Sequence, residues 1–596
     1  MAWIRGAWLC ALLAATGCPD NPTPSDATGS SGPGATTSAT GTTAVTPSES
    51  TSTTAAADST SGDDDDTSAT SATSDDATTT GSPAGQGHIR LLMRAGGRLG
   101  AGSTDLSVYD YDEGRVDQST VHRALDEGRL VQSFGLSAAR TFVHYKTIAE
   151  RRDDERAFIA GYADGSTDAA LRINTAPAPA PGLVGPPQFT SDDGTAAFFA
   201  SASEGGPGIW LSDTTNDAAP VLAHPALGSG DDVTFSFAVG PAGVAITGDF
   251  SGSDLNNLYL ASSDPAVAGP VTQLTFHADP AQRIAPASIG WTPDGSGLIY
   301  RADADIDGLN ELWWVAATGR AAPVRIHTPL ARTDALSTVR LAPDGRAVAY
   351  RVTTDAGGEI YVADLDGKGP SAAVRVSTPT DGAAFSNSLI WSADSDGLIY
   401  TAEHNTPGKR DAYFVDMSGA TPGTPERINS ELAAGGAVVS VVFGPDGDYL
   451  YYVAPQAQAA AELFRAPLVD QVPGVTERIS GPLTDGGSLS GEMVFAPDGS
   501  ALLYTGNADD ADHTELFLLS LGRRTGAAIK VNAELDPGFD VQSASRFSAD
   551  GSMIAYRVRA QDATTATLLV EDLTDGPANP IAVDESVQGF VVLPTR

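Results

Sequence analysis

Apolar residues recur along most of this chain in short runs that polar, glycine-rich segments separate. One clear unit has such runs at residues 289–291, 298–300, 311–315 and 324–326. The runs are rich in β-branched and aromatic residues, which is typical of strands. Similar units begin near residues 131, 186, 235, 287, 338, 387, 439, 491 and 543. The pattern therefore predicts an array of four-stranded units, each about fifty residues long.

A short turn joins the first two predicted strands of most units. Pro293, Asp294 and Gly295 form one copy, and the turn glycines fall at 295, 345, 397, 447, 499 and 551. Proline presets the first turn position, aspartate can accept a hydrogen bond from the turn backbone, and glycine tolerates the last corner. The copy at Asp394 carries an insertion before Gly397 in our interpretation. Weaker copies lie at Gly194, at Gly243 and at residues 136–138.

The repeat favours an all-β fold in which each unit is one blade of a β-propeller, because stacked four-stranded units bury the faces that a single unit exposes. A β-helix would need shorter rungs, and a helical solenoid would need a 3.6-residue period. Residues 88–94, 105–111 and 120–124 predict three strands that lack an innermost partner. Residues 588–593 predict a strand with no blade after it. We expect the two ends to pair, giving about ten blades in one ring or in two smaller propellers.

The repeat resembles that of the TolB-like, or PD40, propeller family, which centres on Trp-Ser-Pro-Asp-Gly followed by an apolar strand. Six copies from residue 287 to the C-terminus match well, beginning with Trp291-Thr292-Pro293-Asp294-Gly295. The resemblance implies the fold and suggests protein partners in the cell envelope. It does not extend to the Tol-Pal role, because TolB itself has an α/β domain before a six-bladed propeller. Propellers of the prolyl-oligopeptidase type carry a hydrolase domain after the blades, where we expect none here.

The first residues read as an export signal. Residues 1–17 combine Arg5 with an apolar stretch from 7 to 15, which predicts a signal peptide too short to span a membrane. The residues before Cys18 resemble the lipobox of bacterial lipoproteins, although Ala15 stands where that family usually has leucine. We expect a lipid on Cys18 and, with Pro19 next, an outer-membrane lipoprotein facing the periplasm or the surface. Cleavage by an ordinary signal peptidase, giving a free secreted protein, is the alternative.

Residues 18–87 form a linker that consists almost entirely of Ser, Thr, Ala, Gly, Pro and Asp after Cys18, including Asp63 to Asp66, with no Lys or Arg. Such a composition buries too little apolar surface to offset the entropy of ordering, which predicts disorder. As a random coil the linker would reach roughly 45 Å. We expect it to act as a spacer ahead of the propeller at residues 88–596.

Charge and cysteine usage narrow the chemistry. The formal charge is −40, from 75 acidic and 35 basic residues, and no later segment gathers a basic cluster. We therefore expect nucleic acid and anionic lipid to be repelled, while cationic partners remain allowed. Both cysteines, Cys10 and Cys18, precede the repeat, which excludes disulfides and thiolate chemistry from the propeller. The eight histidines show no zinc-binding spacing, and neither a Gly-x-Ser-x-Gly elbow nor a P-loop follows the linker.

Acidic loops between the second and third strands of several units are the candidate sites. Asp303, Asp305 and Asp307 have the opening spacing of a calcium loop, but the twelfth position is Trp314 rather than glutamate. Ordinary polar hairpin turns are the alternative to calcium. Other candidate binding-face loops hold Asp249 and Asp254, or Asp509, Asp510 and Asp512. In a closed ring these loops should lie around the mouth of the channel.

The sequence predicts a non-catalytic binding or interaction scaffold of the bacterial cell envelope, with a protein, peptide or glycan ligand. An enzyme acting at the channel mouth, such as a glycan or peptide hydrolase or lyase, is the main alternative. A purely structural surface lipoprotein is another. We expect no cofactor other than the calcium ion considered above.

Overall fold

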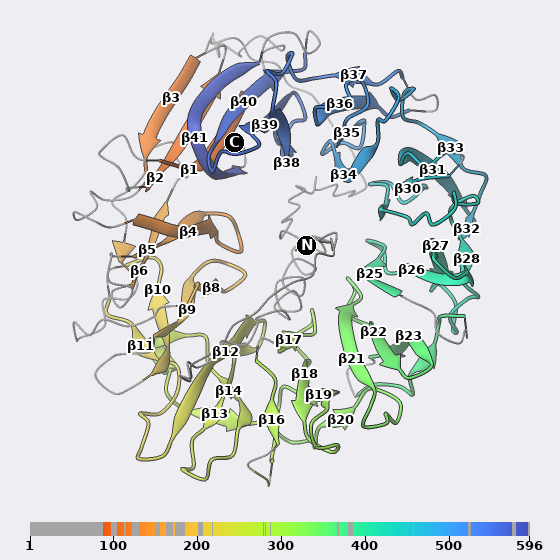
Figure 1. The fold of residues 1–596 in the computed structure, drawn as a ribbon. Helices are drawn as coiled ribbons and strands as arrows, with labels where there is room; N and C mark the ends of the chain where they lie inside the picture. The colour runs from red at the N-terminus through yellow and green to blue at the C-terminus, as the bar shows by residue number, and fades with distance from the viewer. Residues whose placement is uncertain are drawn as a thin grey trace, which may run out of the picture.

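The computed structural model forms one ring of β-sheets around a central axis (Figure 1). It describes residues 88–96, 104–112, 115–121, 130–148, 155–161, 171–172, 185–200, 207–216, 218–277, 279, 282–286, 288–365, 369–378, 385–456, 458–522, 526–574 and 580–593. The predicted signal peptide, Cys18 and linker lie outside these residues. In the described part of the chain, no helix is long and apolar enough to span a membrane.

The first blade joins the two ends of the chain. We name the strands of each blade A to D from the axis outward. Strands B, C and D of this blade are β1 (His88–Gly96), β2 (Thr104–Asp112) and β3 (Arg115–Thr120). Strand A is the second half of β41 (Ile581–Val592), in which Val592 lies opposite Leu91 of β1. The first half of β41 pairs with β40 and completes blade 10, so the predicted pairing of the ends is confirmed.

Blades 2 to 10 follow in chain order, each with its strands listed from A to D. Blade 2 contains β4 (Leu130–Leu136), β5 (Phe142–Ile148), β6 (Glu155–Gly161) and β7 (Leu171–Arg172). Blade 3 contains β8 (Gln188–Phe189), β9 (Thr195–Ala200), β10 (Gly208–Asp213) and β11 (Val221–Leu222). Blade 4 contains β12 (Asp232–Gly240), β13 (Gly243–Asp249), β14 (Asn257–Ala261), the 3₁₀ helix η1 (Pro265–Val267) and β15 (Val271–Gln273). In blade 5, β16 (Arg283–Ile284) and β17 (Gly290–Trp291) share position A beside β18 (Gly297–Asp303), β19 (Asn310–Ala316) and β20 (Val324–Arg325).

The second half of the ring repeats this plan. Blade 6 contains β21 (Ala335–Leu341), β22 (Ala347–Thr354), β23 (Gly357–Asp364) and β24 (Val374–Arg375). Blade 7 contains β25 (Phe385–Trp391), β26 (Gly397–Thr406), β27 (Lys409–Asp416) and β28 (Glu426–Arg427). Blade 8 contains β29 (Ser440–Phe443), β30 (Tyr449–Ala454), β31 (Glu462–Val469), a hairpin strand β32 (Val472–Pro473) and β33 (Glu477–Arg478). Blade 9 contains β34 (Leu489–Phe495), β35 (Ala501–Gly506), β36 (Glu515–Ser520) and β37 (Ile529–Lys530), and blade 10 contains β38 (Phe539–Phe547), β39 (Met553–Ala560), β40 (Ala566–Asp572) and β41.

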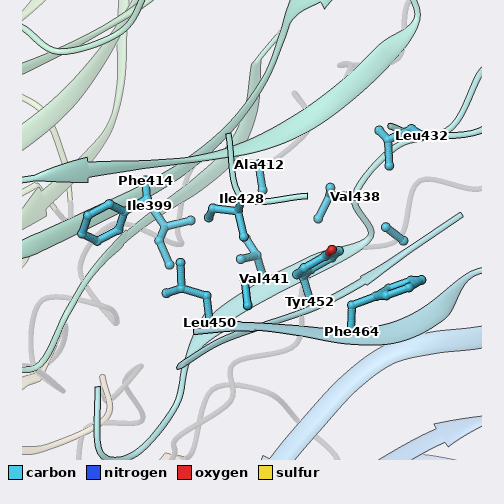
Figure 2. Packing of buried hydrophobic residues seen from close by; sticks show 12 residues of the cluster. Ile399, Ala412, Phe414, Ile428, Leu432, Val438, Val441, Leu450, Tyr452 and Phe464 are labelled. Carbon is cyan, nitrogen blue, oxygen red and sulfur yellow. The ribbon is translucent and has the colours of Figure 1, made fainter. Parts of the chain in front are cut away.

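The apolar core lies between blades rather than within them. Each of the ten interfaces, including that between blades 10 and 1, holds one cluster of buried apolar side chains. Figure 2 shows the cluster between blades 7 and 8, where Phe414 and Ile399 approach Leu450 and Val441. Because the cores follow one another without a gap, the chain forms a single ten-bladed ring, not two propellers.

Strand B carries a buried tyrosine at the same position in many blades, which packs on an aromatic ring of strand C. Tyr400 lies opposite Tyr413 with ring centroids 5.3 Å apart, and Tyr452 stacks on Phe464 at 5.3 Å. Tyr145, Tyr350 and Tyr504 stack in the same way. Tyr300 and Tyr556 are buried at the equivalent position, Tyr556 opposite Leu569 rather than an aromatic ring. The repeated ring fixes which face of strand B is turned toward the preceding blade.

The turn between strands A and B has the predicted chemistry. Asp294 accepts a hydrogen bond from the Ser296 N–H at 3.0 Å, and Gly295 has φ +70°. In blade 7 the corresponding residue is Ser395, also at φ +70°, and Gly397 already begins β26. The predicted insertion before Gly397 is therefore wrong, since this turn has the ordinary length and a serine occupies the left-handed position.

Candidate functional site

The predicted calcium loop is the hairpin between β18 and β19, and its carboxylates are held by separate partners. Asp303 accepts a hydrogen bond from the Gly308 N–H at 2.9 Å. Asp305 pairs with Arg325 at 3.2 Å, and Asp307 faces Arg332 at 3.5 Å. Among the residues that the structure describes, no group of three or more His, Cys, Asp or Glu side chains could hold a metal ion. The three carboxylates thus have separate partners in this arrangement, and calcium at this loop stays a prediction.

The aspartates of the other acidic loops also accept hydrogen bonds from residues of their own loop. Asp249 accepts hydrogen bonds from Ser251, through its N–H at 2.8 Å and its hydroxyl at 2.7 Å. Burial acts to raise the pKa of Asp249, but hydrogen bonds from Ser251 and from the N–H groups of Asp254 and Ser253 outweigh it and lower the pKa. Asp254 has φ +58°, so the loop closes tightly.

A third acidic loop connects β35 to β36 in blade 9. Asp510 accepts a hydrogen bond from the Asp512 N–H at 2.9 Å and lies 3.9 Å from His513, while Asp509 precedes them in the loop. Blades 4 and 5, with the other two loops, lie on the opposite side of the ring (Figure 1). The candidate loops therefore do not form one joint acidic site.

Buried carboxylates recur where strand C begins, and they tie strand C to strand D or B. Glu462 pairs with Arg478 at 2.6 Å, and Glu515 pairs with Lys530 at 2.9 Å. In blade 5, Glu311 has a fully buried side chain, lies 3.5 Å from His327 and accepts the Asp305 N–H at 2.6 Å. These pairs lie within single blades, so we interpret them as structural. Glu311 Oε1, His327 Nε2 and Glu515 Oε2 are nevertheless buried without a hydrogen-bond partner among the described residues.

The two innermost strands of the blades differ in charge from the chain as a whole. Strands A and B, which we call the inner strands, carry more basic than acidic residues in a protein with a net charge of −40. The ten basic residues are Arg90, Arg94, Lys146, Arg283, Arg301, Arg340, Arg351, Arg546, Arg557 and Arg559. The six acidic residues are Asp232, Asp249, Asp303, Glu403, Glu492 and Asp540. The inner strands therefore carry four more basic than acidic residues, opposite in sign to the chain as a whole.

Several inner arginines are partly withdrawn from water. Burial is the main cause that lowers the pKa of Arg301, Arg351, Arg546 and Arg557. Arginine remains charged at neutral pH even so, because its intrinsic pKa is very high. The inner strands thus present cations whose hydration is incomplete, which strengthens their attraction for an anion.

Sequence reasoning missed this arrangement because the arginines are far apart along the chain. A signal was nevertheless present, since Arg301, Arg351 and Arg557 each follow the repeated tyrosine of strand B directly. In addition, Arg557 and Arg559 are two residues apart on one strand and so share a face.

Comparison with known proteins assigns no function to this chain. No protein-family model matches the sequence, and no curated protein matches it. A candidate TolB from Agrobacterium tumefaciens is 15% identical, with a TM-score of 0.26, over 43% of this chain and 83% of that chain. Dipeptidyl peptidase 4 from Porphyromonas gingivalis is 13% identical, with a TM-score of 0.41, over 76% of this chain and 59% of that chain. Prolyl oligopeptidase B from Galerina marginata is 14% identical, with a TM-score of 0.31, over 65% of this chain and 56% of that chain.

This chain thus spans less than two thirds of the length of either peptidase. The TM-scores lie below 0.5 and the identities below 25%, so these likenesses support no assignment of activity or ligand. The ten-bladed ring rests on the strand pairing and on the ten interface cores.

Proposed function

We propose that this protein is a non-catalytic binding module that holds an acidic ligand against the inner strands of its propeller. The single observation that carries the proposal is the reversal of charge between the inner strands and the rest of the chain. The ligand would bear carboxylate or phosphate groups, since the planar guanidinium fork matches both oxoanions.

The strongly acidic remainder of the protein would make such binding selective. An acidic ligand is repelled by most of the surface, so it gains favourable energy only where the inner arginines dominate the local field. Salt should weaken the interaction, because the exposed guanidinium edges remain in contact with solvent.

We also propose that the module works in the bacterial cell envelope, tethered by a lipid on Cys18, with the linker as spacer. The support is the signal-like residues 1–17 and the lysine- and arginine-free composition of residues 19–87. Mass spectrometry of the mature N-terminus tests the tether. An acylated Cys18 supports it, and an unmodified Cys18 would remove it.

The binding proposal is tested by isothermal titration of the mature protein with sodium tripolyphosphate at low ionic strength. We expect saturable binding that is lost when Arg340, Arg351, Arg546 and Arg557 are all changed to Gln. The matched control is Arg427→Gln, an exposed arginine of strand D in blade 7, which should bind as the wild type does. No binding by the wild type, or equal binding by the fourfold variant, would overturn the proposal.

A further inference from the structure

Three inner arginines gather on one face of blade 10. Arg557 and Arg559 lie two residues apart on β39 and therefore point to the same side. Arg546 of β38 lies opposite Ala555, which packs in the core between blades 10 and 1. All three side chains thus leave the backbone on the face of blade 10 that is turned toward blade 1.

A bulge in the innermost strand brings Arg546 to this position. The pairing of β38 with β39 shifts register between Gln542 and Arg546, and Ala544 within the shift has φ +81°. Bulges of this kind redirect a side chain and are frequent beside functional sites. The strained backbone is held by Glu492 of blade 9, whose carboxylate accepts the Ala544 N–H at 2.6 Å.

The hydrogen bonds of Arg557 run to backbone carbonyl oxygens. Its Nη1 donates to Gln588 O at 3.1 Å, and its Nη2 donates to Ser543 O at 3.4 Å, both at exposed positions. Each Nη carries two N–H groups, so each has a second N–H beyond the one used in these bonds. Arg557 also lies over the ring of Phe590, 6.0 Å from its centroid. The open edge of the fork is therefore available to an oxoanion.

The neighbouring arginines do not use up their donors on carboxylates either. Arg546 donates from Nη1 to Ser545 O at 2.7 Å. Asp540 is paired opposite Arg559 in the sheet, but its carboxylate accepts Thr514 N–H at 2.7 Å and the Gln561 side chain at 3.2 Å. The Nε atoms of Arg557 and Arg559 are buried without a hydrogen-bond partner among the described residues.

The charges of this cluster are only partly balanced. Burial lowers the pKa of Arg557, and the charges of Arg559 and Arg546 lower it further, while Glu492 alone acts to raise it. Burial raises the pKa of Glu492, against the Ala544 hydrogen bond and the charge of Arg546. Arg557 therefore feels two neighbouring cations and one carboxylate, which is itself partly desolvated, and an added anion would relieve the repulsion between the arginines.

We propose that Arg546, Arg557 and Arg559 form an oxoanion-binding site at the junction of blades 10 and 1, the anchor for the acidic group of the ligand. A carboxylate or phosphate group binds at the free N–H groups of the Arg557 guanidinium. The positive charges of Arg546 and Arg559 add to the attraction for this anion. This proposal rests on the proposed function and gives it a defined place in the ring.

Blade 6 offers a comparison. Arg351 follows the strand-B tyrosine there as Arg557 does in blade 10, and Arg340 matches Arg546 after a bulge in β21. The residue two places after Arg351 is Thr353, where blade 10 has Arg559. Blade 6 therefore has two of the three cations, and we expect it to bind an oxoanion more weakly.

The test is isothermal titration of the full mature chain with sodium tripolyphosphate and, separately, with citrate. Losing a charge-assisted fork should weaken binding about tenfold in Arg557→Gln and about threefold in Arg351→Gln. The stronger of the two anions identifies whether phosphate or carboxylate is preferred. Arg557→Lys keeps the charge without the fork, so it should fold with at least about threefold weaker binding even if Arg557→Gln does not fold.

Hydrogen exchange gives an independent readout of the same site. Bound tripolyphosphate should slow exchange in β39 and in the second half of β41 more than in β22. Equal losses in Arg557→Gln and Arg351→Gln, or protection centred on blade 6, would overturn the blade 10 site and leave the proposed function standing. No binding of either anion by the wild type would overturn the proposed function as well.

Discussion

Arg557 of blade 10 donates a hydrogen bond to the carbonyl oxygen of Gln588 at 3.1 Å, in the strand that the C-terminus contributes to blade 1. This contact lies where the ring closes. Because the closing strand has no covalent link to β1, its pairing and the core between blades 10 and 1 must hold the two ends together. Closure also protects the edge of β1, which would otherwise be open to pairing with another chain. Closure and the proposed site therefore depend on the same strands.

The closing strand should be a major source of stability. Leu593 is fully buried against blade 2, and its N–H donates to Arg90 O at 2.8 Å. We expect Leu593→Ala to lower the free energy of unfolding by about 3 kcal/mol, because it leaves a cavity at the closure. Urea denaturation followed by circular dichroism measures this. The control Val475→Ala, at a side chain 90% exposed, should change stability by less than about 0.5 kcal/mol. Similar values for the two variants would contradict the closure described here.

A buried carboxylate joins blades 2 and 3. Asp193 accepts hydrogen bonds from the Ala139 N–H at 2.8 Å and from the hydroxyl and N–H of Thr141 at 2.7 and 3.2 Å. Removing it leaves the buried Ser137 hydroxyl and the donors of Ala139 and Thr141 without their acceptor, so Asp193→Ala should cost about 3 kcal/mol of unfolding free energy. The exposed neighbour Asp192 caps only its own turn, and Asp192→Ala should cost about 1 kcal/mol or less. If the two variants have the same melting temperature, the link between blades is weaker than its hydrogen bonds indicate.

The left-handed turn position can be tested without steric interference. Gly447 has φ +78°, and no atom lies within 4 Å of where a Cβ would stand. Gly447→Ala should therefore lower the unfolding free energy by about 1 kcal/mol through backbone strain alone. Gly481 is equally open but lacks a positive φ, so Gly481→Ala is the matched control and should not destabilise. A neutral Gly447→Ala would show that the turn relaxes.

Buried histidines should make the ring sensitive to mild acid. Burial lowers the pKa of His144 to about 4, although the charge of Asp193 acts to raise it. An unfolded histidine takes up its proton near pH 6.5, so the unfolded state binds more protons and stability falls as the pH drops from about 6.5 toward 4. The wild type should lose unfolding free energy between pH 7 and pH 5, and we expect this loss to be about 1 to 2 kcal/mol smaller in His144→Gln. Urea denaturation at each pH measures it. Val475→Ala should keep the wild-type pH dependence, and an unchanged dependence in His144→Gln would exclude His144 as its source.

The repeat could be predicted from the sequence because its determinants are local. Pro293, Asp294 and Gly295 fix a turn by their own conformational preferences, and the apolar runs around them alternate as strands do. The error at Ser395 arose where that rule weakens, since serine adopts the left-handed corner in place of glycine. Its hydroxyl accepts the Asp344 N–H of the neighbouring blade at 3.0 Å, a contact that sequence alone does not reveal.

The arginine cluster could not be predicted in the same way. Arg546 reaches its place through a bulge, and Arg557 meets Gln588 only because the ring closes. Both are consequences of tertiary structure, and neither leaves a local mark in the sequence. The acidic loops were easier to see, because their aspartates are adjacent in the chain. In the structure they mainly bind their own backbone and nearby arginines.

The most direct test of the account is an experimental structure of the mature protein with sodium tripolyphosphate at low ionic strength. We predict a phosphate group within hydrogen-bonding distance of the Arg557 Nη atoms, between β39 and the second half of β41. Phosphate confined to arginines of the outer strands, such as Arg375 or Arg427, would contradict the claim that the inner strands bind the ligand.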